Sequence, residues 1–271
     1  MNLFEAHNVS KKIDGKDILH DISLTISQRE KIAITGANGS GKSSLLKLIG
    51  GIYEHSSGQV IRSPLKVGYV PEHFPETIRF KVYEYLMLTG KMNKQSKGEM
   101  KKKIEYYATV FSILPFLSTP LKNCSKGTKQ KVGIIQALMK DPDLLLLDEP
   151  LTGLDEPSKM ELLYHLQSLQ NECTIIFTAH DSLLINQLAY REVVIENGKV
   201  ISDSTKSQSE KVKYILAEIP SADVNLPIPS LSYQFRDGNR VEIMVTAAVS
   251  NQVLRMLLDQ DCSIIEVKEK G

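Results

Sequence analysis

The sequence predicts an α/β fold with a mixed, mainly parallel sheet. Residues 143–148 and 174–178 are short apolar runs with polar ends, which is typical of strands buried on both faces. Residues 31–35 form a third such run, and they lead directly into a glycine-rich segment and a helical pattern. Strands that alternate with helices in this way favour a parallel sheet.

The remaining elements of the first 200 residues follow from other patterns. Residues 1–30 alternate polar and apolar positions around a turn at Asp14-Gly15, which predicts an antiparallel β subdomain. The helix after the glycine-rich segment stops at Gly50-Gly51. Residues 74–140 have a helical, lysine-rich pattern that predicts a helical subdomain. A further helix is expected over residues 159–169.

The end of the chain predicts a second, smaller unit. Residues 202–210 are polar and serine-rich, so we expect one domain over 1–202 and a small C-terminal α+β domain over 203–271. The smaller domain is expected to contain a strand, a hairpin that turns at Asp237-Gly238, a helix and a last strand. These elements are predicted over residues 212–219, 231–246, 249–258 and 263–267.

Composition excludes several classes of protein. Lysine and arginine number 33 and aspartate and glutamate 32, so a globally basic nucleic-acid binder is excluded. No apolar run approaches the roughly 18 residues of a membrane-spanning helix, and we expect no secretory signal at the polar N-terminus. The three cysteines stand far apart, which predicts neither a disulfide framework nor a zinc site and fits a reducing cytoplasm.

The glycine-rich segment predicts a phosphate-binding loop, because it matches the pattern G-x-x-x-x-G-K-[ST] between a strand and a helix. Glycines let successive backbone N–H groups point at phosphate oxygens, and the positive end of the helix adds to the same spot. Lys42 is placed to reach the β- and γ-phosphates, and the Ser43 hydroxyl to ligate Mg²⁺. The expected nucleotide-binding residues here are Gly36, Ala37, Asn38, Gly39, Ser40, Gly41, Lys42, Ser43 and Ser44.

Polar side chains at the ends of two other strands predict a catalytic site at the same edge of the sheet. Ligands of open α/β sheets bind beyond the carboxyl ends of the strands, where Asp148 and Glu149 are expected. Asp148 is suited to hold Mg²⁺ as the acidic partner of Ser43, and Glu149 to take a proton from an attacking water. His180 also lies just past a buried strand, so we expect it to be catalytic rather than structural.

These residues resemble the nucleotide-binding subunit of an ATP-binding cassette (ABC) transporter over roughly residues 1–200. The decisive segment, residues 124–132, resembles the signature motif of the family, LSGGQ in its commonest form, and departs from it at Cys124, Lys126 and Thr128. Ser125 can cap the following helix and leave the positive end of that helix for an anion. The resemblance implies that this anion is the γ-phosphate held by a partner subunit. The implied contacts are Ser125, Gly127 and Thr128.

Other parts of the chain also match the family. Residues 151–155 resemble the segment that crosses the dimer interface, and His180 matches the histidine that contacts the γ-phosphate. Residues 67–72 resemble the loop whose usual glutamine senses Mg²⁺ and the attacking water. Glu72 stands at that position, and the resemblance implies a catalytic and metal-binding role for it. Ile13 stands where the family stacks an aromatic ring on adenine, so a weaker adenine contact is expected.

The resemblance implies a P-loop NTPase core that uses ATP and Mg²⁺ and hydrolyses ATP to ADP and phosphate. Two copies of the chain would hold two ATP molecules between them and drive a separate transmembrane permease subunit. The location would be peripheral, at the cytoplasmic face of the cell membrane, with no nucleic-acid partner. The form of the signature, the Pro71-Glu72 loop and the C-terminal domain are most similar to bacterial subunits of the export type.

Three alternatives stay open at this point. One is the ATPase of an importer, which would work with a substrate-binding protein. Another is a soluble ABC ATPase that is not coupled to transport, although such relatives usually carry two cassettes or a long coiled coil. The third is a P-loop kinase of small molecules, which would explain neither residues 125–128 nor the Glu149 next to Asp148.

Overall fold

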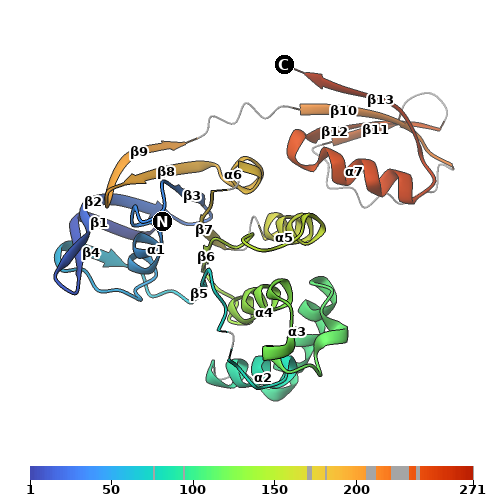
Figure 1. Ribbon diagram of the computed structural model, residues 1–271. Coiled ribbons are helices and arrows are strands. Elements are labelled where there is room, and N and C mark those ends of the chain that lie inside the picture. The colour runs from blue at the N-terminus through green and yellow to red at the C-terminus, as the bar shows by residue number, and fades with distance from the viewer. Residues whose placement is uncertain are drawn as a thin grey trace. The chain divides into compact units, whose positions relative to one another are not determined.

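The computed structural model describes residues 1–75, 77–93, 95–169, 173–180, 182–205, 212–220, 232–235 and 239–270. The chain divides into two compact units, Met1–Lys206 and Ser207–Gly271. The described part of the first unit contains a six-stranded sheet, a three-stranded sheet and several helices, and that of the second a four-stranded sheet and a helix (Figure 1).

The central sheet of the first unit has the strand order β5-β6-β7-β3-β8-β9. Its strands are β3 (Lys31–Thr35), β5 (Val67–Val70), β6 (Leu144–Asp148), β7 (Thr174–Thr178), β8 (Arg191–Glu196) and β9 (Lys199–Thr205). Neighbouring strands run parallel except β8 and β9, which pair antiparallel. The predicted mixed, mainly parallel sheet is confirmed, and the three strands predicted from apolar runs lie side by side as β6, β7 and β3.

These three strands bury side chains on both faces of the sheet, as their sequences predict. Leu144 and Leu146 belong to a core that the sheet shares with helix α1 and the antiparallel strands. Leu145 and Leu147, which alternate with them, belong to a second core on the side of the other helices. Because successive residues of a strand point to opposite faces, a run of four leucines fills both cores at once.

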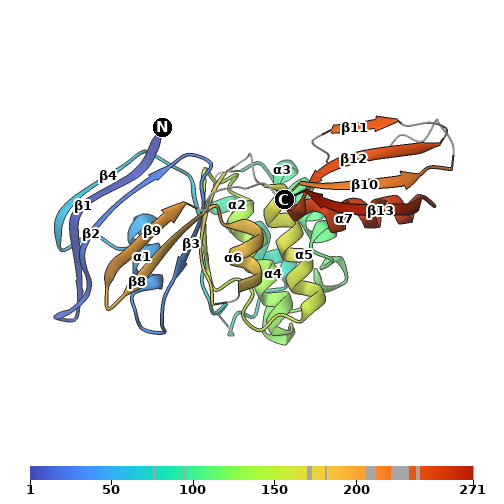
Figure 2. The same cartoon turned by 90° about the horizontal axis from the view of Figure 1, so that it is seen from above.

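The antiparallel β subdomain is a sheet with the strand order β2-β1-β4. Its strands are β1 (Asn2–Ile13), β2 (Lys16–Ser27) and β4 (Ser57–Arg62). Asp14 and Gly15, at φ angles of 48° and 77°, form the predicted turn of the β1–β2 hairpin, where a two-residue turn of this hand suits the strand twist. Helix α1 (Lys42–Ile49) lies between this sheet and the central one (Figure 2) and ends at Gly50, as predicted.

The predicted helical subdomain contains α2 (Val82–Met92), α3 (Lys97–Val110) and α4 (Lys126–Leu138), which pack against one another. Two short 3₁₀ helices, Leu114–Phe116 and Leu121–Asn123, separate α3 from α4. The helix expected over 159–169 begins earlier, as α5 (Glu156–Ser168), because the Asp155 carboxylate accepts a hydrogen bond from the Ser158 N–H at 3.0 Å and caps it. The described residues also include α6 (Ser182–Leu188).

The second unit has the strand order β11-β12-β10-β13, with antiparallel neighbours. Its elements are β10 (Val212–Glu218), β11 (Ser232–Phe235), β12 (Arg240–Thr246), α7 (Ala247–Asp259) and β13 (Ser263–Lys270). The order strand, hairpin, helix, strand is the predicted one, and Asp237-Gly238 lie outside the described residues. Its core joins one face of the sheet to Val253 and Leu257 of α7.

The first unit extends beyond the predicted boundary at Ser202. Strand β9 continues through Thr205, and Asp203 pairs with Val193 of β8. Both oxygens of the Asp203 carboxylate accept hydrogen bonds of 2.7 Å from the Arg191 guanidinium. A polar, serine-rich composition is therefore compatible here with an exposed edge strand, and the units divide after Lys206.

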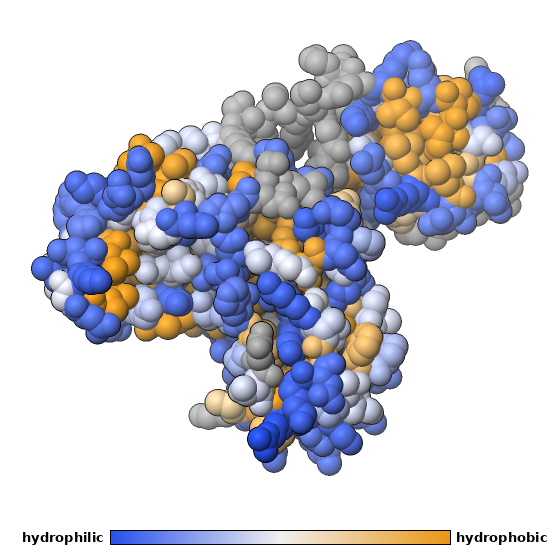
Figure 3. Space-filling view, in the orientation of Figure 1, coloured by the Kyte–Doolittle hydropathy of each residue, from blue (hydrophilic) through white to orange (hydrophobic). Residues whose placement is uncertain are grey.

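The surface of the second unit is partly apolar. Figure 3 shows apolar residues gathered on the visible face of this unit. Its described large apolar residues with high exposure are Leu258, Ile265 and Val267. Among the described parts of the chain, no helix has both the length and the apolar character needed to cross a bilayer.

Lys31, at the start of β3, is fully buried, and its ammonium donates hydrogen bonds to the carbonyls of Cys173 (2.7 Å) and Leu169 (3.3 Å). We expect Lys31→Met to lower the free energy of unfolding by about 1–3 kcal/mol, because these carbonyls lose a donor. Urea denaturation measures the loss. Lys16→Met, on the exposed part of β2, is the control and should change stability by less than about 0.5 kcal/mol. Equal effects of the two substitutions would contradict this role of Lys31.

Candidate functional site

Three neighbouring parallel strands bring the predicted residues to one edge of the central sheet. Ile34 of β3 and Asp148 of β6 both stand opposite Thr178 of β7, so the three strands end at nearly the same level. The glycine-rich loop, Glu149 and His180 follow these ends directly. The sheet therefore sets the relative positions of side chains that lie far apart in the sequence.

The glycine-rich loop wraps around the ammonium of Lys42. This side chain is 6% exposed, and its Nζ donates to the carbonyls of Gly36 at 3.0 Å and Ala37 at 3.1 Å. Gly36 has a φ of 144°, and a Cβ at this position would lie 2.1 Å from the Ile195 carbonyl oxygen, so only glycine fits. Gly39 and Gly41 also have positive φ angles, of 77° and 108°.

The rest of the loop is open to ligands. Ala37, Asn38 and Gly39 are exposed. Ser43 and Ser44, in the first turn of α1, are half-buried. The buried hydroxyl oxygen of Ser40 has no hydrogen-bond partner among the described residues. Such an unpaired polar atom is costly unless a ligand or water satisfies it.

Three hydroxyl groups from three elements surround the Asp148 carboxylate. Its Oδ1 accepts hydrogen bonds from Ser43 Oγ at 3.0 Å and from Thr178 Oγ1 at 2.7 Å. Its Oδ2 lies 3.4 Å from the hydroxyl of Tyr69 on β5. Burial, followed by the charge of Asp148 and the hydrogen bond to it, raises the pKa of Tyr69 far above its usual value, so this hydroxyl remains a donor.

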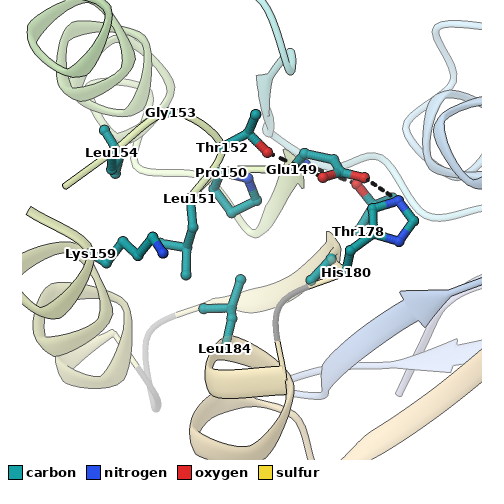
Figure 4. Close-up of a pocket in the computed structure, with 11 residues that line it drawn as sticks. Glu149, Pro150, Leu151, Thr152, Gly153, Leu154, Lys159, Thr178, His180 and Leu184 are labelled. Atoms are coloured by element: carbon teal, nitrogen blue, oxygen red, sulfur yellow. Dashed lines mark hydrogen bonds and ion pairs between the residues drawn. The ribbon is translucent and has the colours of Figure 1, made fainter. Parts of the chain in front are cut away.

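Glu149 is held in an unusual backbone conformation, with a φ of 49°. Its N–H donates to Thr178 Oγ1 at 2.9 Å, and its Oε2 accepts from Thr152 Oγ1 at 3.2 Å. Its Oε1 lies 2.9 Å from His180 Nε2. Figure 4 shows the carboxylate between Thr152 and His180, at a hollow of about 230 Å³.

His180 joins the loop to Glu149 through a single ring nitrogen. Nε2 lies 3.0 Å from Lys42 Nζ and 2.9 Å from Glu149 Oε1. The Lys42 ammonium can only donate a hydrogen bond, and the Glu149 carboxylate can only accept one. Nε2 therefore accepts from Lys42 when it carries no hydrogen, or donates to Glu149 when it carries one. The imidazole can therefore exchange one contact for the other with a change of tautomer.

The segment that resembles the signature motif lies around a different hollow. Ser125 Oγ accepts a hydrogen bond from the Thr128 N–H at 3.1 Å and caps α4, as predicted. Ser125, Gly127 and Thr128 line a hollow of about 290 Å³, whose lining includes none of residues 36–44. Lys126 lies across Gly153, where a Cβ would come within 2.7 Å of its side chain. This contact joins the start of α4 to the segment at 151–155.

Two further predicted residues, Glu72 and Ile13, lie just after strand β5 and at the end of strand β1. Glu72 follows β5, lies 3.7 Å from His73 Nε2, and lines a hollow of about 710 Å³ with Lys126, Lys129 and Gln130 of α4. Its charge also acts on Tyr69, which contacts Asp148. Ile13 is half-buried at the end of β1.

Sequence reasoning missed Thr178, Tyr69 and Thr152, whose hydroxyls contact Asp148 or Glu149. Thr178 had a usable signal, because it is the last residue of a buried strand, where a polar side chain needs a partner. Tyr69 and Thr152 had no comparable signal, since their partners depend on strand pairing and on a local turn.

The oxygen atoms of Asp148 and Ser43 are suitable ligands for Mg²⁺. Within the described residues, no three His, Cys, Asp or Glu side chains gather into a metal site. Mg²⁺ is usually held by one or two carboxylates together with waters and substrate phosphates, so Asp148 and the Ser43 hydroxyl are a sufficient protein contribution. Ser43 can give a lone pair to the cation while its O–H continues to donate a hydrogen bond to Asp148.

Comparison with known proteins defines the class. The sequence profile of the family described as "ABC transporter" matches residues 19–152. The zinc import ATP-binding protein ZnuC of Psychrobacter arcticus is 35% identical over 184 residues, which cover 66% of this chain and 74% of that protein. The linearmycin resistance ATP-binding protein LnrL of Bacillus subtilis is 29% identical over 217 residues, 76% of this chain and 70% of that protein.

The fold has solved counterparts. The dimeric, post-hydrolysis structure of the ATP-binding cassette MJ0796 with ADP and Pi matches with a TM-score of 0.69 at 23% identity, over 75% of this chain and 99% of that one. The chain belongs to the ABC transporter family of ATP-binding proteins. It is thus an ATP-binding cassette with the P-loop NTPase fold, and ATP binding and hydrolysis are the activity of its family.

The fit of Gly36 under Ile195 predicts a selective loss of nucleotide binding. In Gly36→Ala the added methyl meets a backbone carbonyl, so the loop has to move, and we expect the Kd for ATP to rise at least about tenfold while the fold persists. Gly15→Ala is the control, since its φ is also positive but its Cβ meets nothing within 4 Å. Calorimetric titration with ATP measures both. A Kd for Gly36→Ala as small as that of the control would contradict the geometry.

Proposed function

We propose that this chain is the ATP-hydrolysing subunit of an ABC transporter of the export type, dimerising on ATP to drive a separate membrane subunit. The observation that carries the proposal is that Lys42 of the phosphate loop and Glu149 meet at one nitrogen of His180. Lys42, which would bind phosphate, and Glu149, which would orient the water, thus lie within one site. The Asp148–Ser43 pair lies beside them.

In the proposed reaction, the loop amides and Lys42 bind the phosphates and neutralise their charge. Ser43 and Asp148 would hold Mg²⁺, which supplies further positive charge to the phosphate oxygens. Glu149 orients a water and accepts one of its protons as the oxygen bonds to the γ-phosphorus and the bond to ADP breaks. His180 is placed to contact the γ-phosphate while it orients the Glu149 carboxylate.

The second half of the site comes from another copy of the chain in this proposal. Ser125, Gly127 and Thr128 lie at the start of α4, whose N–H groups and positive end suit a phosphate. They face a hollow that the phosphate loop of the same chain does not line. The cassette MJ0796 is dimeric in its ADP- and Pi-bound structure, and this supports a two-copy arrangement here by analogy.

The partner in the membrane is proposed to dock near Glu72. The hollow between the Glu72 segment and α4 is larger than the hollows at Glu149 and at Ser125, at about 710 Å³. The amide nitrogen of Gln130 is buried beside it without a hydrogen-bond partner among the described residues. A bound segment with a carbonyl or carboxylate would satisfy this donor. The chain would then lie at the cytoplasmic face of the cell membrane.

The direction of transport has two candidates. Export is favoured by the form of the signature segment and by the C-terminal domain, as judged by resemblance. Import is the alternative, because several of the relatives are named for zinc import. Purification of the native complex from membranes and identification of the accompanying chains tests this. Recovery of a substrate-binding protein would favour import, and absence of any membrane subunit would contradict transport coupling.

Glu149→Gln is expected to bind ATP and to hydrolyse it about 10²–10⁴-fold more slowly, because an amide cannot accept the proton of water. Release of phosphate measures the rate, and titration with ATP measures binding. Glu105→Gln, on the exposed side of α3, is the control and should hydrolyse at the normal rate. A normal rate in Glu149→Gln would remove Glu149 from the mechanism.

The two-copy site is tested by two helix caps. In the Glu149→Gln background, sedimentation with ATP and Mg²⁺ should show a dimer, and Ser125→Ala should raise the Kd of that dimer at least about tenfold. Ser96→Ala is the matched control, because Ser96 caps α3 by accepting from Glu99 N–H at 3.3 Å and lies outside the proposed site. Both variants lose a cap worth about 1 kcal/mol. An unchanged dimer in Ser125→Ala would refute its phosphate contact.

A further inference from the structure

The hydroxyl of Thr178 is shared by the two acidic residues of the site. Thr178 is fully buried at the end of β7. It donates its hydrogen to Asp148 Oδ1 at 2.7 Å and accepts the Glu149 N–H at 2.9 Å. One oxygen atom thus binds the side chain proposed to hold Mg²⁺ and the backbone of the residue proposed to orient the water.

The bond to Asp148 affects how that carboxylate is presented. Oδ1 accepts hydrogen bonds from the hydroxyls of both Thr178 and Ser43. Among the described residues, Oδ2 accepts one longer hydrogen bond, of 3.4 Å, from Tyr69. Without Thr178, rotation of the carboxylate about its last bond would be limited by Ser43 alone on the Oδ1 side. Hydrogen bonds to metal-binding carboxylates orient them, and their loss typically costs about 10–100-fold in metal affinity or activity.

The bond to Glu149 affects its backbone. A φ of 49° is uncommon for a residue with a side chain, and it costs of order 1 kcal/mol or more unless the surroundings hold it. The Thr178 hydroxyl provides such a hold, because it fixes the N–H of Glu149 from the neighbouring strand. Release of this N–H would let Glu149 relax toward an extended backbone and turn its carboxylate away from His180.

We propose that Thr178 is a positioning residue for ATP hydrolysis, whose hydroxyl fixes the Asp148 carboxylate for Mg²⁺ and the Glu149 carboxylate for the attacking water. This inference rests on the proposed roles of Asp148 and Glu149 and adds a residue that acts through both. Thr178 does not touch nucleotide in this account, and its effect passes entirely through its two hydrogen bonds.

The same strand provides a matched control. Thr174, at the opposite end of β7, is 1% exposed, and its Oγ1 accepts the Arg29 N–H at 2.7 Å. Thr→Val keeps the shape of the side chain and removes the hydroxyl at either position. Both substitutions therefore remove a buried hydrogen-bond acceptor from the same strand. They differ in that the Thr178 hydroxyl contacts Asp148 and Glu149, whereas the Thr174 hydroxyl lies at the other end of the strand.

The test compares Thr178→Val, Thr178→Ser and Thr174→Val in the full chain. We expect Thr178→Val to lower kcat for ATP hydrolysis about 10–100-fold at saturating ATP and Mg²⁺. Thr178→Ser, which keeps the hydroxyl, should restore kcat to within about threefold of the original chain. Thr174→Val should keep kcat while losing a similar amount of thermal stability. A Thr178→Val protein with the original kcat, or a Thr174→Val protein with an equal loss, would overturn the proposal.

A binding measurement separates this proposal from the role of Glu149. Affinity for a fluorescent ADP analogue is measured with and without Mg²⁺. The factor by which Mg²⁺ tightens binding should fall about tenfold in Thr178→Val and be unchanged in Thr178→Ser and Thr174→Val. An unchanged factor in Thr178→Val would refute its action on Asp148. If Glu149→Gln hydrolyses ATP normally, the proposed mechanism fails, but this binding comparison still decides whether Thr178 acts through Asp148. If Thr178→Val does not fold, Thr178→Ala takes its place.

Discussion

The parallel register of β3, β6 and β7 is the constraint on which the site depends. Asp148 and Ile34 face Thr178 from the two sides of β7, so the segments that leave these strands do so at one level. The phosphate loop lies more than a hundred residues from Glu149 and His180 in sequence, yet the three meet within hydrogen-bond distance. A slip of one residue would also turn each strand over, exchanging the leucines of one core for those of the other. Burial on both faces therefore protects the geometry of the site.

The hydroxyl groups around Asp148 fix the orientation of its carboxylate at the edge of the sheet. Ser43 comes from α1, Thr178 from β7 and Tyr69 from β5, so the carboxylate is held by three elements that the cores already fix. Each hydrogen bond to a charged group contributes only about 1.5–3 kcal/mol. Their value lies in restricting orientation, since a carboxylate that binds a metal has to present one oxygen in one direction.

Much of the site could be predicted because its strongest signals are local. The spacing of residues 36–43 already contains the turn, the helix start and the lysine, and Asp148-Glu149 directly follow an apolar strand. Thr178 carried only the weaker signal of a polar residue at the end of a buried strand, and Tyr69 carried none, because their partners come from strands that pair across the sheet. Strand β9 was missed for a related reason. Its residues are polar, and its stability comes from pairing with β8 and from the Arg191–Asp203 contact.

The division of the chemistry between two hollows explains why hydrolysis in this proposal needs a second copy. Lys42, Asp148, Glu149 and His180 share the sheet edge, whereas Ser125 caps a helix that belongs to the helical subdomain. Lys126 lies across Gly153, four residues after Glu149, so in the proposed dimer a shift of α4 would act on the segment that follows the proposed catalytic carboxylate. In this proposal, a γ-phosphate bound by Ser125 of one copy belongs to the nucleotide of the second copy and completes the site of that second copy. Its binding would also affect the position of Glu149 in the first copy. Closure of one site and alignment of the other then become a single event, which is what a dimeric ATPase requires to hydrolyse only when both copies are engaged.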